Sequence, residues 1–559
     1  MSARSLLPIF MLCASVAALP GCGEQPEPPP VADLAPVGAT LLDGLGGYSK
    51  PIASRGPDVQ RWFDQGLILT YGFNHDAAER SFLRAAELDP DCAMCWWGAA
   101  LVLGPHVNAG MDPKNNAAAW DRLQRAQAAA SGAPEWEKAY IRALAARYEA
   151  NPPEDRRPLD EAYADAMAEL TRVHPDDLDA ATLYAESLMN LQPWDYWDAD
   201  GKPLGRIEEI VGRLESVMER NPGHMGALHL YIHAVEASDD PERGVRAADH
   251  LGDLVPAAGH LVHMPAHIYG RVGRWHDAVV ANQKAILADD AYLAICRPAP
   301  GVYPLGYVPH NHHFLWFAAT MAGASETALE AARATHERTS DPELMRAPGF
   351  EAMQAFALTP VFANVRFGRW DDIAAEPKPA ADLPYMVAMW HYSQGLAAAR
   401  QGRIDDARGH HAALAEATEN PAIDHMKVWN RYSLIHAVRI GERVLAAEVA
   451  LADRDVEAAV AALREAVPIE DGIPYDEPPG WHLPVRQSLG AVLLAEGRPD
   501  EAEEVYRAEL RRNPDNGWSL YGLKQALLAQ GKEDEAEAAA GRFERAWAHA
   551  DVELTASQF

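Results

Sequence analysis

The sequence predicts an all-α protein, in which about ten helical hairpins stack into a right-handed superhelix with loop insertions. Three observations lead to this prediction. The chain has 559 residues, which is more than one hydrophobic core usually serves. A pattern of small, aromatic and proline residues recurs with a period of about 34 residues. No stretch of alternating apolar and polar residues is long enough to indicate a competing sheet.

Composition and charge narrow the class of function. The chain is 48% hydrophobic and 23% charged, which is typical of a folded protein rather than a disordered one. Acidic residues outnumber basic ones by 81 to 49, giving a net charge of -32. Phosphate binding needs a basic surface, so we expect no nucleic acid as a partner. The acidic excess is interpreted as the solubilising surface of a large helical protein.

Residues 1–22 have the features of an export signal. Arg4 supplies a positive start, and the apolar run over 6–18 is too short to span a bilayer as a helix. Small residues follow up to Cys22, whose surroundings resemble a bacterial lipoprotein cleavage box, in which the cysteine is lipidated. Pro20 is atypical there, so secretion without a lipid, or no export, stays open. We expect a protein of the periplasm or cell envelope, attached to a membrane only through Cys22.

The next segment, residues 23–56, is predicted to be a tether between the anchor and the solenoid of residues 57–559. Its first part is acidic and rich in proline, a composition that favours a stiff extended chain.

Three cysteines remain after the signal. Cys92 and Cys95 form a lone CxxC pair without a following histidine, which excludes attachment of a c-type haem. In an oxidising compartment the pair can close as a local disulfide. Reduced structural cysteines, or a redox or metal role, are the alternatives.

The repeat pattern is clearest in residues 62–90. Gly66 and Ala78 occupy places where the two helices of a hairpin approach most closely, and Phe82 packs onto the next hairpin. Pro90 ends the second helix. The same spacing returns, in full or in part, at Ala266, Gly273, Ala278, Gly368, Gly395, Gly402, Ala407, Ala459, Gly490, Gly497, Ala502, Tyr506, Pro514 and Gly531.

This pattern resembles that of tetratricopeptide (TPR) repeat proteins, and the resemblance covers most of the chain from Val59 to Val552. It implies that the first helix of each hairpin lines the concave face of the superhelix and the second helix the outside. It also implies that a protein, a peptide or a small ligand binds in the concave groove.

Three insertions break the period, and each carries aromatic residues. They cover residues 192–201, 291–309 and 470–484. Insertions in solenoids form loops, often beside the binding face. We expect lids or stacking surfaces over the groove, with Trp194 and Trp197 contacting a ligand. The alternative is that these aromatic residues fill the gaps that the insertions leave between hairpins.

Histidines recur in step with the repeat. His229 and His233 are four residues apart, as are His263 and His267, and the two pairs are offset by 34 residues. Residues four apart share one face of a helix. In the phase of the repeat, both pairs belong to first helices, at places that face the concave groove in tetratricopeptide proteins. Glu236, three residues after His233, lies on the same face.

Neighbouring hairpins extend the set. The phasing gives His313 the place of His263 and His310 the place of His260, and one hairpin before His229 it turns Glu186 toward the groove. Helices in contact lie about 8–10 Å apart, so these side chains can converge on one ion. Ligands of this kind suit Zn²⁺, Fe²⁺, Cu²⁺ or Mn²⁺. The expected metal ligands are His229, His233, His263, His267, His313 and Glu236, with His260, His310 and Glu186 as secondary candidates.

Other interpretations compete with a metal centre. Groove histidines can bind one another, the loops or an anionic ligand without a metal, or they can be core residues by coincidence. His229 and His263 are not followed by glutamate, so the zinc protease signature is absent. Pro265 fits only the first turn of a helix. A helix starting near Met264 would leave His263 at its cap and loosen the spacing to His267.

The sequence therefore predicts an exported solenoid with a transition-metal site in its groove. A metal with an open position would activate water or dioxygen. Glu236 is then the candidate catalytic base, and Tyr231, Tyr269 and Arg271 would orient a substrate. No nucleophile elbow, phosphate-binding loop or dinucleotide fingerprint occurs. Whether the protein is an enzyme stays open, and a metal-free scaffold for a protein or peptide in the cell envelope is the alternative.

Overall fold

The structure, a computed structural model, describes residues 39–199, 201–298 and 300–559. The expected export signal, the expected lipidation at Cys22 and the start of the expected tether lie outside the described residues. Within them the predicted all-α solenoid is confirmed. The strands found there are β1 (Lys427–Val428) and β2 (Tyr432–Ser433), which form one antiparallel pair. None of the helices described is both long enough and apolar enough to cross a membrane.

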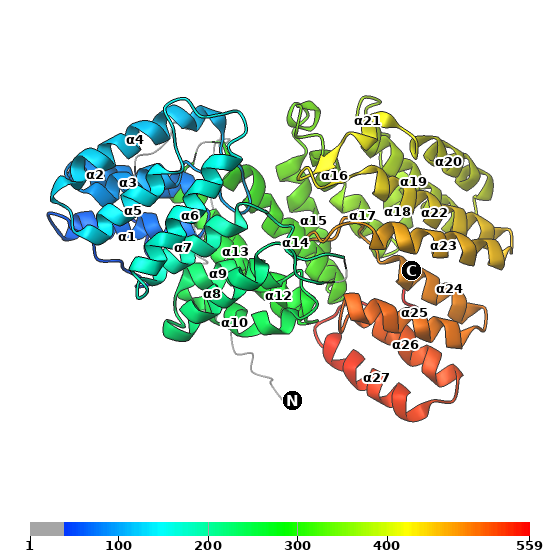
Figure 1. The fold of residues 1–559 in the computed structure, drawn as a ribbon. Helices are drawn as coiled ribbons and strands as arrows, with labels where there is room; N and C mark the ends of the chain where they lie inside the picture. Colours follow the sequence, from blue (N-terminus) through cyan, green and yellow to red (C-terminus); the bar gives the residue numbers. More distant parts are fainter. Residues whose placement is uncertain (1–38, 200, 299) are drawn as a thin grey trace, which may run out of the picture.

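Each helix packs mainly on its neighbours in sequence. In Figure 1 the chain runs from α1–α5 at the left to α19–α23 at the right, and α24–α27 then turn back below them toward the middle. The first part contains α1 (Pro57–Tyr71), α2 (His75–Leu88), α3 (Ala93–Leu101), α4 (Asn116–Ala129), α5 (Glu135–Ala145), α6 (Arg157–Val173), α7 (Leu178–Met189), α8 (Ile207–Arg220), α9 (Met225–Val235) and α10 (Val245–Leu254). The middle contains α11 (Gly259–His263), α12 (Pro265–Arg271), α13 (Trp275–Cys296), α14 (Val308–Met321), α15 (Ser325–Thr339), α16 (Met353–Ala357), α17 (Thr359–Arg366) and α18 (Trp370–Ala375).

The last part follows the same plan. It contains α19 (Pro384–Arg400), α20 (Ile404–Ala417), α21 (Pro421–Asp424), α22 (Ile435–Ala452), α23 (Val456–Asp471), α24 (Val485–Ala495), α25 (Pro499–Arg512), α26 (Gly517–Ala529) and α27 (Glu533–Ala546). Short helical turns between the longer helices cover Pro113–Asn115, Ala130–Gly132, Pro241–Gly244, Tyr303–Tyr307 and Leu344–Arg346.

Small residues allow the hairpins to pack closely around aromatic rings. Phe82 is fully buried, and its ring lies against Gly66 of α1 and Gly98 of α3. A Cβ atom added at Gly98 would lie 2.5 Å from this ring. Tyr506 has the same relation to Gly490 near the other end of the chain. The alternation of small and aromatic residues in the repeat therefore reflects direct contact between successive helices.

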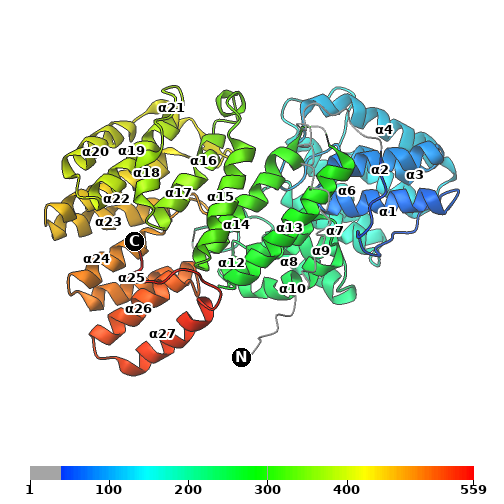
Figure 2. The same cartoon turned by 180° about the vertical axis from the view of Figure 1, so that it is seen from behind.

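The C-terminal hairpins also contact the middle of the molecule. Trp518 of α26 donates from Nε1 to the carbonyl of Thr320, at 2.9 Å. Trp275 of α13 donates in the same way to the carbonyl of Pro514, at 2.8 Å. In both views α24–α27 lie beside the end of the middle helices (Figures 1 and 2). The solenoid thus has contacts between repeats that are distant in sequence, which a simple stack lacks.

Residues 39–56 lie against the first hairpins. Lys50 is 9% exposed, and its ammonium group pairs with Asp177 at 3.0 Å and Asp179 at 3.2 Å. The hydroxyl of Tyr48 donates to the Asp179 carboxylate at 2.6 Å. This part of the expected tether, residues 39–56, is therefore packed on the solenoid. Buried carboxylates need hydrogen-bond or charge partners, and Tyr48 and Lys50 supply them, which favours packing of this segment on the solenoid.

The cysteines adopt one of the alternatives left open above. Cys92 and Cys95 are joined by a disulfide at the start of α3, and Cys296 is a buried free thiol.

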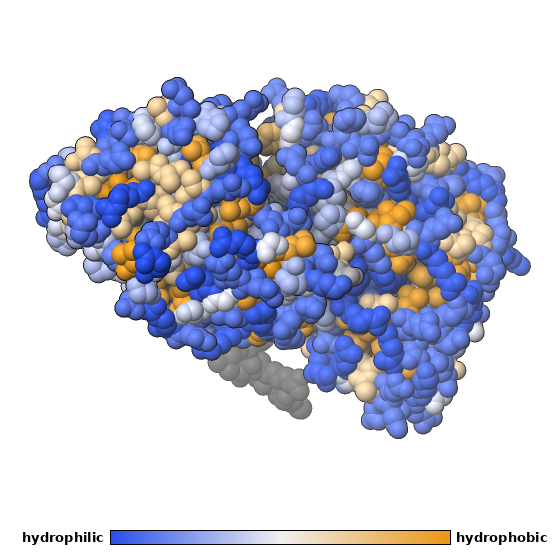
Figure 3. All heavy atoms as spheres, viewed as in Figure 1, coloured by the Kyte–Doolittle hydropathy of each residue, from blue (hydrophilic) through white to orange (hydrophobic). Residues whose placement is uncertain are grey.

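The surface is largely polar. On the face shown in Figure 3, hydrophilic residues cover most of the area and hydrophobic residues form separate patches.

Candidate metal centre

Six histidines from neighbouring helices meet in one buried region. They form two groups of three, in each of which one ring nitrogen of every histidine lies within 4.8 Å of one in the others. The first triad consists of His229 and His233 from α9 and His260 from α11. The second triad consists of His263 and His267 from α11 and α12 and His310 from α14. These buried groups have the residue types and the spacing to hold a metal ion.

The second triad converges on one nitrogen. Nε2 of His263 lies 2.7 Å from Nε2 of His267 and 3.1 Å from Nε2 of His310. Nδ1 of His263 faces the side-chain oxygen of Asn282 at 2.7 Å, and the amide nitrogen of Asn282 donates to the carbonyl of Ala278. The amide is thereby oriented, so Nδ1 of His263 carries a proton and its Nε2 carries a lone pair directed at the other two rings.

Two carboxylates hold His267. Its Nδ1 lies 2.6 Å from an oxygen of Glu236 and 2.6 Å from an oxygen of Glu477. Burial alone would lower the pKa of His267, but the charges of Glu477 and Glu236 outweigh burial and raise it to about 10. Protonated His267 donates from Nε2 to the lone pair on Nε2 of His263, which accounts for their short contact. A metal ion bound to these two nitrogens would take the place of this proton.

The first triad has a similar arrangement. Nε2 of His229 lies 3.1 Å from Nε2 of His260, and Nδ1 of His229 donates to the carbonyl of Tyr71 at 2.6 Å. Nδ1 of His233 donates to Glu236 at 2.9 Å, while its Nε2 has no hydrogen-bond partner among the described residues. Burial lowers the pKa of His229 and His260 well below the usual value, and that of His233 to about 3. These rings are therefore neutral near pH 7, the form that binds metals.

Glu236 lies between the triads. It is 1% exposed, and one carboxylate oxygen accepts from His233 while the other accepts from His267. His233, Glu236 and His267 also lie close enough together to hold an ion themselves. Contacts of 2.6 and 2.9 Å to protonated Nδ1 atoms are hydrogen-bond distances. Glu236, predicted as a ligand or catalytic base, is thus placed to orient two histidines.

Glu477 is the residue that the sequence did not indicate. It lies in the third insertion, residues 470–484, of which only the aromatic residues were considered from the sequence. Tyr475 of the same loop donates to Glu236 at 3.3 Å. The loop is held by the short hairpin of β1 and β2: Arg431 donates to the carbonyl of Tyr475, and the hydroxyl of Tyr432 donates to Asp476. Only this tertiary contact brings Glu477 to the histidines, so no local pattern could have identified it.

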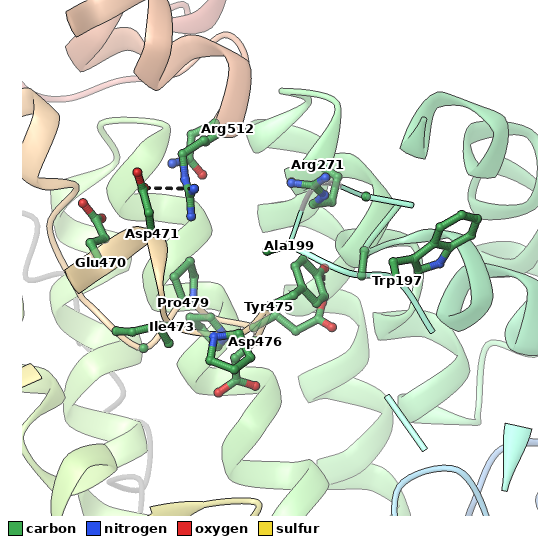
Figure 4. Close-up of a pocket in the computed structure, with 18 of the residues that line it drawn as sticks. Trp197, Ala199, Arg271, Glu470, Asp471, Ile473, Tyr475, Asp476, Pro479 and Arg512 are labelled. Carbon is green, nitrogen blue, oxygen red and sulfur yellow. Dashed lines mark hydrogen bonds and ion pairs between the residues drawn. The ribbon is translucent and has the colours of Figure 1, made fainter. Parts of the chain in front are cut away.

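A cavity of about 700 Å³ opens beside the second triad. The first and third insertions form much of its wall, which also includes His267, Glu477 and Arg271. Figure 4 shows Trp197 and Arg271 at one end and the ion pair of Asp471 with Arg512 at the other. Both insertions therefore line a cavity.

Among the predicted ligand-binding residues, three lie at the site. Trp194 packs edge-on against His233, with ring centroids 5.3 Å apart. Trp197 donates to the carbonyl of Ala234, and Arg271 donates to the carbonyl of Glu236 at 2.8 Å. All three line the cavity.

The prediction that His313 joins the ligands is wrong. It repeats the place of His263 in the next hairpin, but four residues later that hairpin has Phe317 in place of a second histidine. The ring of His313 instead stacks on Trp316, with centroids 5.1 Å apart, and contacts Phe356. His310, a secondary candidate, supplies the third nitrogen.

Tyr231, Tyr269 and Glu186 also lie away from the triads. The hydroxyl of Tyr231 donates to Glu215, and that of Tyr269 donates to Asp249. Each tyrosine is two residues from a ligand histidine, and two residues turn a helix by about 200°, so it points to the opposite side. The carboxyl of Glu186 faces Asn190, and burial raises its pKa to about 7 against the opposing charge of Arg147.

The expectation that Pro265 loosens the second pair is also wrong. Met264 has helical dihedral angles, φ -50° and ψ -36°, so the chain continues from α11 into α12 without leaving the helical conformation. Pro265 has no N–H to donate, and the amide of His267 donates to the carbonyl of Met264, three residues earlier. His263 and His267 stay on one side and their Nε2 atoms meet.

The fold and this site define an α-solenoid that places a polar buried centre on successive helices. Residues 493–546 match the tetratricopeptide repeat family model, which agrees in this segment with the pattern predicted from the sequence. Tetratricopeptide repeats generally bind proteins or peptides. No curated protein matches the chain significantly in sequence.

Two solved structures align with most of the chain at low similarity. The crystal structure of the APC/C hetero-tetramer Cut9-Hcn1 has a TM-score of 0.31 at 14% identity, covering 89% of this chain and 78% of that one. The human IFIT1 dimer with m7Gppp-AAAA has a TM-score of 0.28 at 14% identity, covering 88% of this chain and 91% of that one.

Proposed function

We propose that this solenoid binds a transition-metal ion in the second triad and uses it in chemistry on a small molecule held in the adjoining cavity. The observation that supports this most is the convergence of three Nε2 atoms, with His263 lying 2.7 and 3.1 Å from the other two. Nitrogen ligands about 2.0–2.1 Å from a tetrahedral ion are about 3.3 Å apart. The two separations from His263 therefore reach this value with movements of a few tenths of an ångström.

The surroundings of the ligands favour the same function. Metal-bound histidines usually donate their second ring N–H to a carboxylate or carbonyl, which fixes the tautomer. His263 has such an acceptor in Asn282, and His267 has one in Glu236. Glu236 and Glu477 also supply negative charge to balance a cation in a buried place. Phe314 stacks on His267, with ring centroids 5.3 Å apart, and limits the ring's movement.

The donor set selects among the expected metals. Three imidazoles suit Zn²⁺, Cu²⁺ or Fe²⁺, whereas Mn²⁺ prefers oxygen ligands. A set of three protein ligands leaves a position for water or substrate, as in catalytic sites. Since the cavity reaches His267 and Glu477, a bound small molecule would have access to that position.

Metal analysis of the purified protein tests this proposal. We expect at least one transition-metal ion per chain, retained on dialysis and lost in the variant His263→Ala/His267→Ala. The matched control is His391→Ala/His410→Ala, which removes a second pair of contacting histidines, with Nδ1 atoms 2.9 Å apart. The proposal would be ruled out if the purified protein contained no metal and its melting temperature did not change on addition of Zn²⁺, Cu²⁺ or Fe²⁺.

The second candidate is a metal-free scaffold that binds a protein or peptide. The family match of residues 493–546 supports it, because such repeats commonly serve this purpose. The two candidates predict different metal contents, because a metal-free scaffold would be purified without an ion. A scaffold would also still bind its protein or peptide partner in the variant His263→Ala/His267→Ala.

Export with lipidation at Cys22 is a separate part of the proposal. It is supported by the resemblance of the first 22 residues to a lipoprotein signal. The variant Cys22→Ser should move the protein from the membrane fraction to the soluble fraction. Identical fractionation of the variant and the wild type would contradict the anchor.

A further inference from the structure

The two triads are built by the same rule. Each takes two histidines four apart from one hairpin and a third from the start of the next. The first uses His229 and His233 with His260, and the second repeats the pair 34 residues later. From this duplication we infer that the protein holds two metal ions, one in each triad, and that Glu236 positions ligands of both. The inference rests on the proposed function.

The first triad has the features that support metal binding in the second. Its histidines are at most 2% exposed. The Nδ1 atoms of His229 and His233 donate to oxygen acceptors, so their Nε2 atoms carry lone pairs. Nε2 of His233 lacks a partner in the described part of the chain, and so does Nδ1 of His260. Buried nitrogens are rarely left without a partner, and an ion between the rings would supply one for His233.

Aromatic side chains enclose both triads in the same way. Phe73 packs on His229, with ring centroids 4.5 Å apart, as Phe314 packs on His263 at 5.2 Å. Tyr307 lies over His260, with centroids 4.5 Å apart. These rings restrict the imidazoles to a few orientations and keep bulk water away, which raises the effect of each nearby charge.

Glu236 is the physical link between the two ions. Its two oxygens accept from His233 of the first triad and His267 of the second. The repeat does not duplicate this carboxylate, because Gly270 stands 34 residues after Glu236. The third insertion supplies Glu477 in its place. Loss of Glu236 should therefore weaken both sites, whereas loss of one histidine should empty one site.

Titration with Co²⁺ and Zn²⁺, with metal content measured after dialysis, tests this. We expect two ions per chain in the wild type and in the His391→Ala/His410→Ala control. His260→Ala and His310→Ala should each retain one ion. Glu236→Ala should reduce affinity at both sites by about 10- to 100-fold, the usual effect of losing such an orienting group.

The outcomes separate this inference from the proposed function. One ion in the wild type, lost in His310→Ala and unchanged in His260→Ala, would overturn the metal site in the first triad and leave the proposed function of the second triad intact. No ion in any variant would overturn both. Circular dichroism melts establish that each variant is folded. If His260→Ala does not fold, His260→Asn keeps a polar side chain of smaller size and should also bind one ion.

Discussion

On four histidines of the centre, His229, His233, His263 and His267, the proton is placed by the atom that Nδ1 faces. Oxygen acceptors from Tyr71, Glu236 and Asn282 hold Nδ1–H bonds, and the free Nε2 atoms converge. The i, i+4 pairs and their period could be read from the sequence, because helical spacing and repeat length fix which side chains share a face. The acceptors could not, since Tyr71 and Asn282 come from other helices.

A first prediction concerns Asn282, which contacts only the second triad. Asn282→Ala removes the acceptor for His263 and should weaken one of the two bound ions by about 10- to 100-fold. Asn282→Asp keeps an acceptor and should restore most of that affinity. The measurement is a competitive Zn²⁺ titration. Equal affinities in all three proteins would show that the tautomer of His263 does not depend on this contact.

A second prediction concerns pH and Asp289. Tyr303 and Asn311 donate to its carboxylate, yet burial dominates and raises its pKa to about 7. The unfolded pKa is about 3.9, so the folded state favours the protonated form. This contribution to stability is complete below about pH 4 and is lost as pH rises to 7, by up to roughly 4 kcal/mol.

Asp289→Asn removes that titration. Relative to the wild type, the variant should therefore gain stability as pH increases from 4 to 8. Urea unfolding at several pH values measures the difference in free energy of unfolding. A difference that stays constant across this range would contradict a raised pKa at Asp289.

Single helices show why local patterns predicted some elements better than others. The alternation of small and aromatic residues indicated the hairpins well, because Gly66 and Gly98 touch Phe82 directly. Pro265 was misleading, since a proline lowers the stability of a helix but does not end it when the neighbouring residue keeps helical angles. The prediction from the repeat pattern was wrong for His313. The position four residues later, which corresponds to His267, holds Phe317.

A third prediction compares two glycines inside helices. At Gly98 a Cβ atom would lie 2.5 Å from the Phe82 ring, whereas at Gly212 of α8 it would meet nothing within 4 Å. Gly98→Ala should therefore cost about 1–3 kcal/mol through overpacking. Gly212→Ala should stabilise the protein by about 0.5–1 kcal/mol, because it removes flexibility from the unfolded chain. Chemical denaturation measures both, and equal effects would exclude the close packing at Phe82.

At the scale of the whole molecule, the stacking of neighbours was predictable but the long-range contacts were not. A repeat pattern specifies what adjoining hairpins bury against each other. It carries no information on the contact of Trp518 with Thr320, nor on the docking of Lys50 with Asp179. Glu477 belongs to the same class, because it reaches the histidines only when the last third of the chain folds against the middle.

A fourth prediction tests one of these contacts. Asp551, near the C-terminus, accepts from the backbone amides of Ser325 at 2.6 Å and Glu326 at 3.0 Å, at the start of α15. It thus caps a helix that has no capping side chain of its own. Asp551→Ala should cost about 1 kcal/mol, as for other caps. Hydrogen exchange should increase at both the first turn of α15 and the C-terminal segment.

The control is Asp534→Ala, at an exposed position in the first turn of α27. Loss of a favourable interaction with the helix dipole there should cost about 0.3–1 kcal/mol and affect α27 alone. Faster exchange that is confined to the C-terminal segment in Asp551→Ala would argue against the cap.

The position of Glu477 in the chain has a consequence for the order of events during synthesis. A ribosome makes the chain from its N-terminus, and N-terminal parts generally fold first. All six histidines of the two triads precede residue 311, whereas Tyr475 and Glu477 follow much later. A chain that folds from its N-terminus, on the ribosome or after export, therefore brings the six imidazoles together before the segment that closes over them, and cations can reach them before that closure.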